Sequence, residues 1–83
     1  MKEKIVFSGI LYNEEFKIRW NIYVAEKEIV IEENNEVQKS IIEFHVLENT
    51  EYSLFSSPLA KGSTLEEALN NFLKVEKELL KTL

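Results

Sequence analysis

Apolar and polar residues alternate along residues 16–24, and this alternation predicts a β-strand. The apolar positions are Phe16, Ile18, Trp20, Ile22 and Val24. Successive side chains of a strand point to opposite faces of a sheet, so this segment has one buried face and one solvated face. Similar patterns predict further strands at about residues 4–12, 29–32, 37–47 and 52–55.

Polar segments separate the predicted strands. Asn13-Glu14-Glu15 suits a hairpin turn, and residues 25–28 predict a four-residue loop. Asn34 and Asn35 suit a tight reversal between the third and fourth strands, because Asn tolerates positive φ. Glu48-Asn49-Thr50 predicts the turn before the fifth strand.

The length of the first turn determines which side chains of the first strand face inward. A two-residue Asn13-Glu14 turn pairs Phe7 with Trp20 and Ile5 with Ile22. A three-residue loop would reverse every side chain of this strand. We favour the shorter turn because it brings two large apolar side chains together.

The later turns predict that the remaining strands share this inner face. The four-residue loop places Val24 opposite Ile29, and the Asn-Asn turn places Glu32 opposite Val37. With these pairings, one side of the sheet carries Ile29, Ile31, Ile42, Phe44 and Val46.

Residues 64–82 have the periodicity of an amphipathic helix. Ser56-Ser57-Pro58 ends the strand pattern because Pro cannot donate to a ladder, so residues 56–63 are expected to form a connecting loop. Ser63-x-x-Glu66 and Thr64-x-x-Glu67 both fit a capping box. The apolar stripe of the helix consists of Leu65, Ala68, Leu69, Phe72, Leu73, Val75, Leu79, Leu80 and Leu83.

These elements predict one α+β domain over residues 1–83. Its fold is an antiparallel meander sheet of four to five strands, over residues 4–55, with one C-terminal helix packed on one face. The predicted core contains Trp20, Ile22, Ile31, Phe44, Phe72 and Leu79. Five strands make a sheet roughly 20 Å wide, whereas one helix is about 10 Å across.

The outer face of the sheet is therefore expected to expose apolar side chains that the helix cannot cover. Large exposed apolar patches usually mark binding sites for a partner. The candidate interface consists of Val6, Ile10, Tyr12, Val30, Ile41, Leu47, Tyr52 and Leu54. We expect a protein-interaction module that forms a homodimer or binds a protein partner.

Composition narrows the class of protein further. The net charge is −5, and all 15 acidic residues are Glu, a balance that disfavours nucleic acid as a partner. The chain has no Cys, which excludes disulfides and Cys-ligated zinc. It has no signal-peptide pattern and no apolar stretch of the roughly 18 residues that span a bilayer. We expect a cytoplasmic protein.

Candidate catalytic chemistry is sparse. His45 is the only histidine, and no recognisable motif supplies it with a nucleophile or a second acid–base group. The pairs Glu14-Glu15, Glu32-Glu33 and Glu66-Glu67 fall at predicted turns and at the helix start, where solvation and capping explain them. We predict no catalytic residues, cofactor site or metal site.

An alternative function is the binding of single-stranded nucleic acid. Lys17, Arg19 and Tyr23 fall on the outer face of the second predicted strand, where charge and stacking could act together. The order of sheet and helix is similar to that of the four-strands-and-helix domains of single-strand-binding transcription cofactors. Nearby glutamates, including Glu14, Glu15 and Glu26, oppose this reading.

Residues 59–71, Leu-Ala-Lys-Gly-Ser-Thr-Leu-Glu-Glu-Ala-Leu-Asn-Asn, resemble the Gly-x-Thr-x-Glu-Glu-Ala helix entry of HicB-like antitoxins. In that family a small strand-rich domain neutralises a toxin partner, so the resemblance implies an antitoxin-like or phage-type inhibitor. The chain departs from the family pattern because about fifty residues of predicted strand precede the motif.

Overall fold

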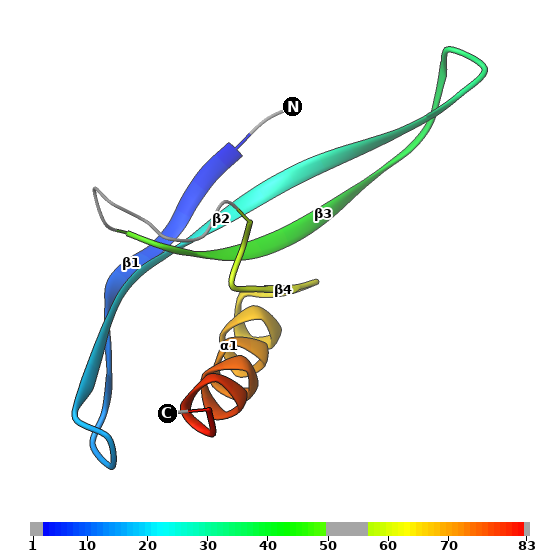
Figure 1. Ribbon diagram of the computed structural model, residues 1–83. Coiled ribbons are helices and arrows are strands. Elements are labelled where there is room, and N and C mark those ends of the chain that lie inside the picture. The colour runs from blue at the N-terminus through cyan, green and yellow to red at the C-terminus, as the bar shows by residue number, and fades with distance from the viewer. Residues whose placement is uncertain (1–2, 50–56, 83) are drawn as a thin grey trace.

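The computed structural model describes residues 3–49 and 57–82, which form a four-stranded antiparallel sheet and one helix (Figure 1). The sheet order follows the chain, so the strands form a meander. This confirms the predicted α+β fold with a C-terminal helix. The elements are β1 (Glu3–Asn13), β2 (Ile18–Glu33), β3 (Glu36–Glu48), β4 (Ala60–Gly62) and α1 (Leu65–Leu80).

Strand β2 runs without a break through residues 25–28, where a loop was predicted. Ala25 pairs with His45 and Lys27 pairs with Glu43, so the ladder continues across this segment. The predicted loop is wrong because alternating charges are compatible with a solvated strand, and the segment contains no Gly, Pro or Asn to favour a reversal.

The β2–β3 turn has the predicted form, but a bulge follows it. Asn34 and Asn35 have φ values of 55° and 65°, and Glu32 pairs with Val37 as expected. The next residue of β2, Ile31, pairs with Lys39, so β3 has one extra residue between these two pairs and the register shifts. A bulge of this kind reverses the facing of every later residue in the strand.

Two features of the structure change which face of the sheet a side chain occupies: β2 continues where a loop was predicted, and β3 contains a bulge. In β3 beyond the bulge both changes apply, so the predicted facing of its side chains is correct. Val46 lies opposite Val24 on the helix-facing side, and Phe44 lies on the same side. For Ile31 only the first change applies. This predicted core residue therefore lies on the opposite side and is 38% exposed.

The β1–β2 turn is longer than predicted, and it includes Lys17 at a φ of 56°. Leu11 pairs with Trp20 and Phe7 with Val24, a shift of four residues that keeps Phe7 on the inner face. A bulge near the start of β1 then pairs Ile5 with Ala25. Ile5 is consequently exposed and does not face Ile22.

Helix α1 begins at the predicted Thr64-x-x-Glu67 cap, with the Glu67 carboxylate accepting from Ser63 instead of from the Thr64 backbone N–H. The Thr64 hydroxyl accepts a hydrogen bond from the Glu67 backbone N–H at 3.1 Å, and the Ser63 hydroxyl donates to the Glu67 carboxylate at 2.9 Å. The buried side of the helix has four-residue spacing and consists of Ala68, Phe72, Glu76 and Leu80. Leu79, a predicted core residue, is exposed because it lies about 100° around the helix from Leu80.

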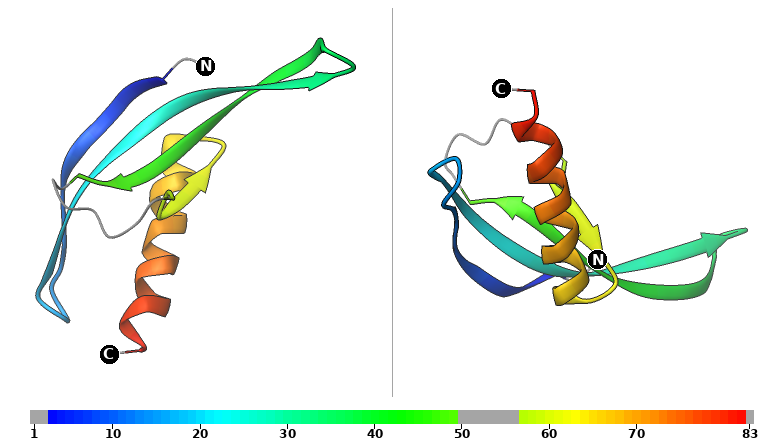
Figure 2. Two further views of the ribbon diagram at one scale, coloured as in Figure 1. Left: turned by 45° about the horizontal axis from the view of Figure 1, so that its top comes forward. Right: turned by 90° about the horizontal axis from the view of Figure 1, so that it is seen from below.

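The core lies between α1 and one face of the sheet (Figure 2). Trp20 and Phe44, both predicted core residues, pack against its edge. Strand β4 falls within the predicted loop 56–63, and the predicted strand at residues 52–55 lies outside the described residues. The buried cluster consists of Ile22, Val24, Val46, Ala60, Ala68 and Phe72.

Gly62 allows β4 to lie directly against the start of α1. A Cβ at this position would stand 2.4 Å from the Ala68 backbone nitrogen and 2.8 Å from the Glu67 carbonyl carbon. We expect Gly62→Ala to lower the free energy of unfolding by about 1–3 kcal/mol, because helix backbone cannot move aside without disturbing the core. Urea denaturation measures this loss.

Gly9→Ala is the matched control. A Cβ at Gly9 would meet only the end of the Phe7 ring, at 3.3 Å, and that ring can shift. We expect a change within about 0.5 kcal/mol. Equal denaturation midpoints for the two variants would show that the contact between β4 and α1 is looser than described.

Candidate functional site

The predicted interface residues do not form one patch. Ile10 and Tyr12 are exposed on β1, and Ile41 and Leu47 lie on the same face of the sheet in β3, away from α1. Val30 lies on the opposite face, because β2 continues where a loop was expected.

The remaining residues of the predicted interface are Val6, Tyr52 and Leu54. The bulge in β1 turns Val6 inward, where it packs against the core cluster. Tyr52 and Leu54 lie outside the described residues.

The residues of the nucleic-acid alternative are also separated. Lys17 lies in the β1–β2 turn, before β2 begins. Arg19 and Tyr23 share a face of β2, but the Arg19 guanidinium lies 5.9 Å from the centre of the Tyr12 ring. Of the three side chains, the Arg19 guanidinium is best suited to bind phosphate, and it is already engaged in this cation–π contact.

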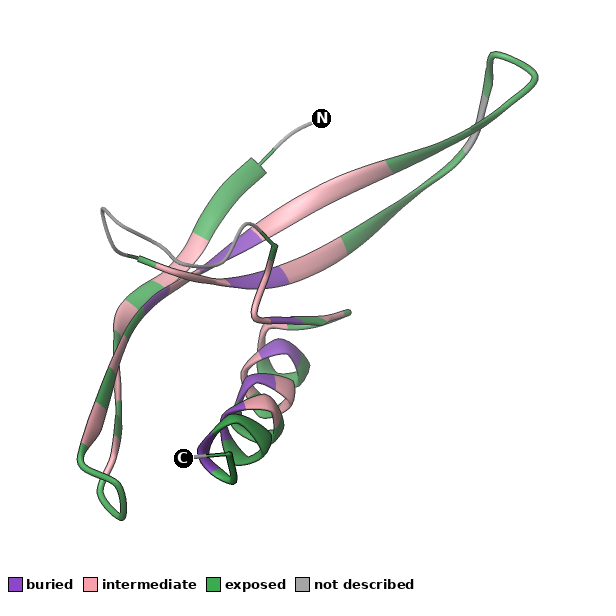
Figure 3. Ribbon diagram, viewed as in Figure 1, coloured by how far each residue is buried: buried purple, intermediate pink, exposed green. Residues whose placement is uncertain are grey.

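A cluster of four exposed aliphatic side chains lies on a two-stranded projection that we call the arm, residues 28–42. Among the described residues, β1 pairs with β2 as far as Lys27, and β4 pairs with β3 at residues 44–46. The arm therefore extends beyond both neighbouring strands and beyond α1 (Figure 1). Most of its length is exposed, as the green far end in Figure 3 shows.

Branched aliphatic side chains occupy both faces of the arm. Ile29 pairs with Ile41, and Ile31 lies on the same side. Val30 and Ile42 lie on the other side. Val30, Ile31, Ile41 and Ile42 are each 38–46% exposed. A two-stranded ribbon with no core of its own is marginally stable in water, so this arrangement favours a surface that another molecule covers.

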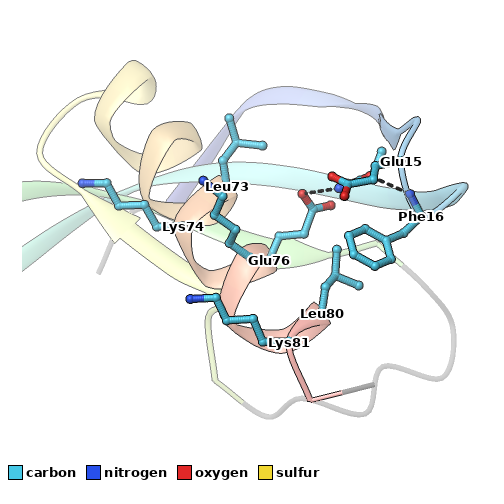
Figure 4. Close-up of a pocket in the computed structure, with 9 residues that line it drawn as sticks. Glu15, Phe16, Leu73, Lys74, Glu76, Leu80 and Lys81 are labelled. Carbon is cyan, nitrogen blue, oxygen red and sulfur yellow. Dashed lines mark hydrogen bonds between the residues drawn. The ribbon is translucent and has the colours of Figure 1, made fainter.

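A pocket of about 460 Å³ lies at the other end of the molecule, between the β1–β2 turn and the C-terminal half of α1 (Figure 4). We call it the lysine pocket. Phe16 and Leu73 contribute apolar surface and are 47% and 51% exposed. Its lining residues are Asn13, Glu15, Phe16, Leu73, Lys74, Glu76, Lys77, Leu80 and Lys81.

Glu76 connects the helix to the first hairpin at the base of this pocket. It is 7% exposed, and its two carboxylate oxygens accept hydrogen bonds from the Trp20 indole N–H at 2.5 Å and the Asn13 amide at 3.0 Å. The Asn13 side-chain oxygen also accepts from the Phe16 backbone N–H at 3.0 Å. These bonds hold the turn and the helix in a fixed relation.

Sequence reasoning did not identify Glu76 as part of the buried cluster. The available signal was its position four residues after Phe72 and four before Leu80, on the apolar side of the helix. The Trp20 ring meets Phe72 edge-on, with centroids 5.5 Å apart, and this packing directs the indole N–H toward the carboxylate.

His45 is the second buried polar side chain, on the face of the sheet away from α1. It is 7% exposed, and among the described residues neither ring nitrogen has a hydrogen-bond partner. The Glu43 carboxylate lies 3.8 Å from Nε2. Burial lowers the pKa of His45, and the positive charge of Lys27 on β2 and of Lys61 on β4 adds to this, against the opposing effect of Glu43.

Two further kinds of site are not formed by the part of the chain that the structure describes. Within residues 3–49 and 57–82, no group of three or more His, Cys, Asp or Glu side chains could hold a metal ion. No helix in these ranges is long and apolar enough to cross a membrane.

Comparison with protein-family models, with curated proteins and with solved structures found no match.

The contact between Trp20 and Glu76 can be tested without removing the ring. Trp20→Phe retains an aromatic side chain beside Phe72 but removes the indole N–H that the buried carboxylate accepts. We expect a loss of about 1–3 kcal/mol in the free energy of unfolding, because one carboxylate oxygen remains buried without a donor.

Glu78→Gln is the matched control for the role of charge in α1. Glu78 is largely exposed and pairs only with Lys81 at the surface, at 3.2 Å. The loss of this ion pair in Glu78→Gln should lower the free energy of unfolding by less than about 1 kcal/mol. Glu76→Gln replaces a buried carboxylate that accepts from two donors by an amide, and it should lower the free energy of unfolding further. Similar losses for Glu76→Gln and Glu78→Gln would contradict the buried cluster.

The lowered pKa of His45 predicts a specific pH dependence. The unfolded chain binds a proton near pH 6.5 and the folded chain only at lower pH, so this residue favours folding above about pH 6.5. That contribution is lost as the pH falls through the folded pKa. Unfolding free energies between about pH 8 and pH 5 should decline more for the parent than for His45→Gln. Parallel curves would exclude a titrating buried His45.

Proposed function

We propose that this protein is a non-catalytic interaction module that self-associates through its arm. The observation that carries this proposal is the exposure of branched aliphatic residues on both faces of a two-stranded ribbon. Such a ribbon gains stability when a second surface covers it, because covering the exposed part of each of these aliphatic side chains contributes about 1 kcal/mol.

The size of the exposed surface supports a second copy as the covering partner. The chain exposes 6394 Å², whereas a compact monomer of 9.8 kDa exposes about 5,200 Å². The excess of about 1,200 Å² exceeds the about 800 Å² that each partner contributes to an interface of standard size. The radius of gyration of 14.7 Å likewise exceeds the about 12 Å expected for a compact domain of this length.

The arm also favours protein over nucleic acid as the partner. Residues 28–42 contain four Glu and one Lys, so this surface repels phosphate. Arg19 and Lys17 lie outside the arm, and Arg19 is engaged with Tyr12. No specific observation favours the nucleic-acid alternative.

The oligomeric state tests the proposal directly. Sedimentation equilibrium from micromolar to millimolar concentration should give about twice the 9.8 kDa of one chain for the parent protein. A variant with both Ile41→Thr and Ile42→Thr retains β-branched side chains but loses apolar surface on each face of the arm. Its dissociation constant should rise about tenfold or more.

Ile10→Thr is the control for this experiment. Ile10 is at least as exposed as the arm residues but lies on β1, outside the arm. This substitution should leave the dissociation constant unchanged within about twofold. A parent protein that remains monomeric at all concentrations would overturn the proposal, and an equal effect of Ile10→Thr would show that the sheet face, and not the arm, forms the contact.

A further inference from the structure

We propose that the arm of one copy docks into the lysine pocket of a second copy. This inference rests on the proposed self-association and names the surface that receives the arm. The two surfaces are complementary in charge and in apolar character. The tip of the arm and the β1–β2 turn that lines the pocket lie at opposite ends of the molecule, so a chain cannot fill its own pocket with its own arm (Figure 1).

The tip of the arm carries concentrated negative charge. Glu32, Glu33 and Glu36 surround the Asn34-Asn35 turn, and all five residues are exposed. Among the described residues these carboxylates have no ion-pair partner, and the only cation of the arm is Lys39, paired across the ladder with Ile31. Without a cationic partner the three carboxylates repel one another at close range.

The rim of the lysine pocket carries three lysines and the exposed carboxylate of Glu15, so cations outnumber anions there. Lys74, Lys77 and Lys81 follow one another at three- and four-residue spacing along α1, which brings them to one side of the helix. Lys81 forms a solvent-exposed pair with Glu78, and within the described chain Lys74 and Lys77 have no carboxylate partner. Exposed pairs of this kind contribute little, so the lysines are available to an incoming anionic group.

The apolar parts of the two surfaces also correspond. The pocket presents Phe16 and Leu73, both about half exposed, above the buried Leu80. The arm presents Ile31 and Val30 next to its acidic tip. An apolar contact surrounded by ion pairs is the usual anatomy of a protein interface, with the apolar centre supplying affinity and the charged rim orienting the partners.

The pocket is preformed because the Glu76 hydrogen bonds hold its two walls together. Asn13 and Trp20 join the first hairpin to α1 through this carboxylate, so binding does not have to order either wall. Each copy has one arm and one pocket, and a two-fold axis lets both arms and both pockets be used. This symmetry closes the assembly at two copies.

Charge reversal tests the inference. One variant carries Glu32→Lys, Glu33→Lys and Glu36→Lys in the arm, and the other carries Lys74→Glu, Lys77→Glu and Lys81→Glu at the pocket. Each variant alone places like charges together in both contacts of its dimer. Its dissociation constant should rise about tenfold or more, and added salt should reduce the difference from the parent.

An equimolar mixture of the two variants provides the rescue. In the mixed dimer the reversed arm meets the reversed pocket, and the unchanged arm meets the unchanged pocket, so both contacts are complementary again. The mixture should form a heterodimer with the dissociation constant of the parent to within about threefold. Impaired folding of either variant alone cannot produce this recovery, which preserves the test if a triple substitution is destabilising.

The possible failures are distinguishable. If both variants dimerise as tightly as the parent, the arm does not dock in the lysine pocket, but self-association stands. If the variants are weakened and the mixture does not recover, the charges act elsewhere and the inference is wrong. If the parent itself is monomeric, the proposed function fails together with this inference.

Discussion

The constraint on which this structure depends is the mismatch in length between its one helix and its sheet. The 16 residues of α1 span about 24 Å, whereas the 16 residues of β2 follow a curved path of about 50 Å. The helix therefore covers only the middle of the sheet, where Ile22 and Val24 are fully buried. The remainder of β2 and β3 forms a ribbon without a core, and the exposure of its isoleucines follows from this shortage of covering surface.

Much of the architecture can be predicted from local patterns. Alternation along β2, the Asn-Asn turn and the Thr64 helix cap each rest on neighbouring residues, and each has the expected form. The face that each side chain occupies depends instead on whether every connection between strands has an odd or an even number of residues. One extra residue moves every side chain of the following strand to the other face. The facing of Ile31 was predicted wrongly because a loop was expected at residues 25–28, where β2 continues, and the bulge in β3 has no local signal either.

The candidate surfaces were harder to predict than the fold, because each joins residues that are distant in the chain. The lysine pocket combines the turn at Phe16 with lysines 58 to 65 residues later in the chain. Its supporting carboxylate, Glu76, lies on the apolar side of the helix pattern, but its hydrogen-bond donor becomes evident only when the position of Trp20 is known. The sequence predicted uncovered apolar side chains on one broad face of the sheet, whereas the structure has exposed aliphatic side chains on both faces of the arm.

The bulge that turns Val6 inward also affects the outer edge of the sheet. Strand β1 is an edge strand, and the free backbone groups along such an edge can recruit further strands without limit. A bulge interrupts the regular spacing of these groups and twists the strand locally, so an incoming segment cannot continue the ladder past it. The bulge therefore shortens the regular edge that β1 offers to another strand, leaving only Phe7 to Asn13 in uninterrupted register.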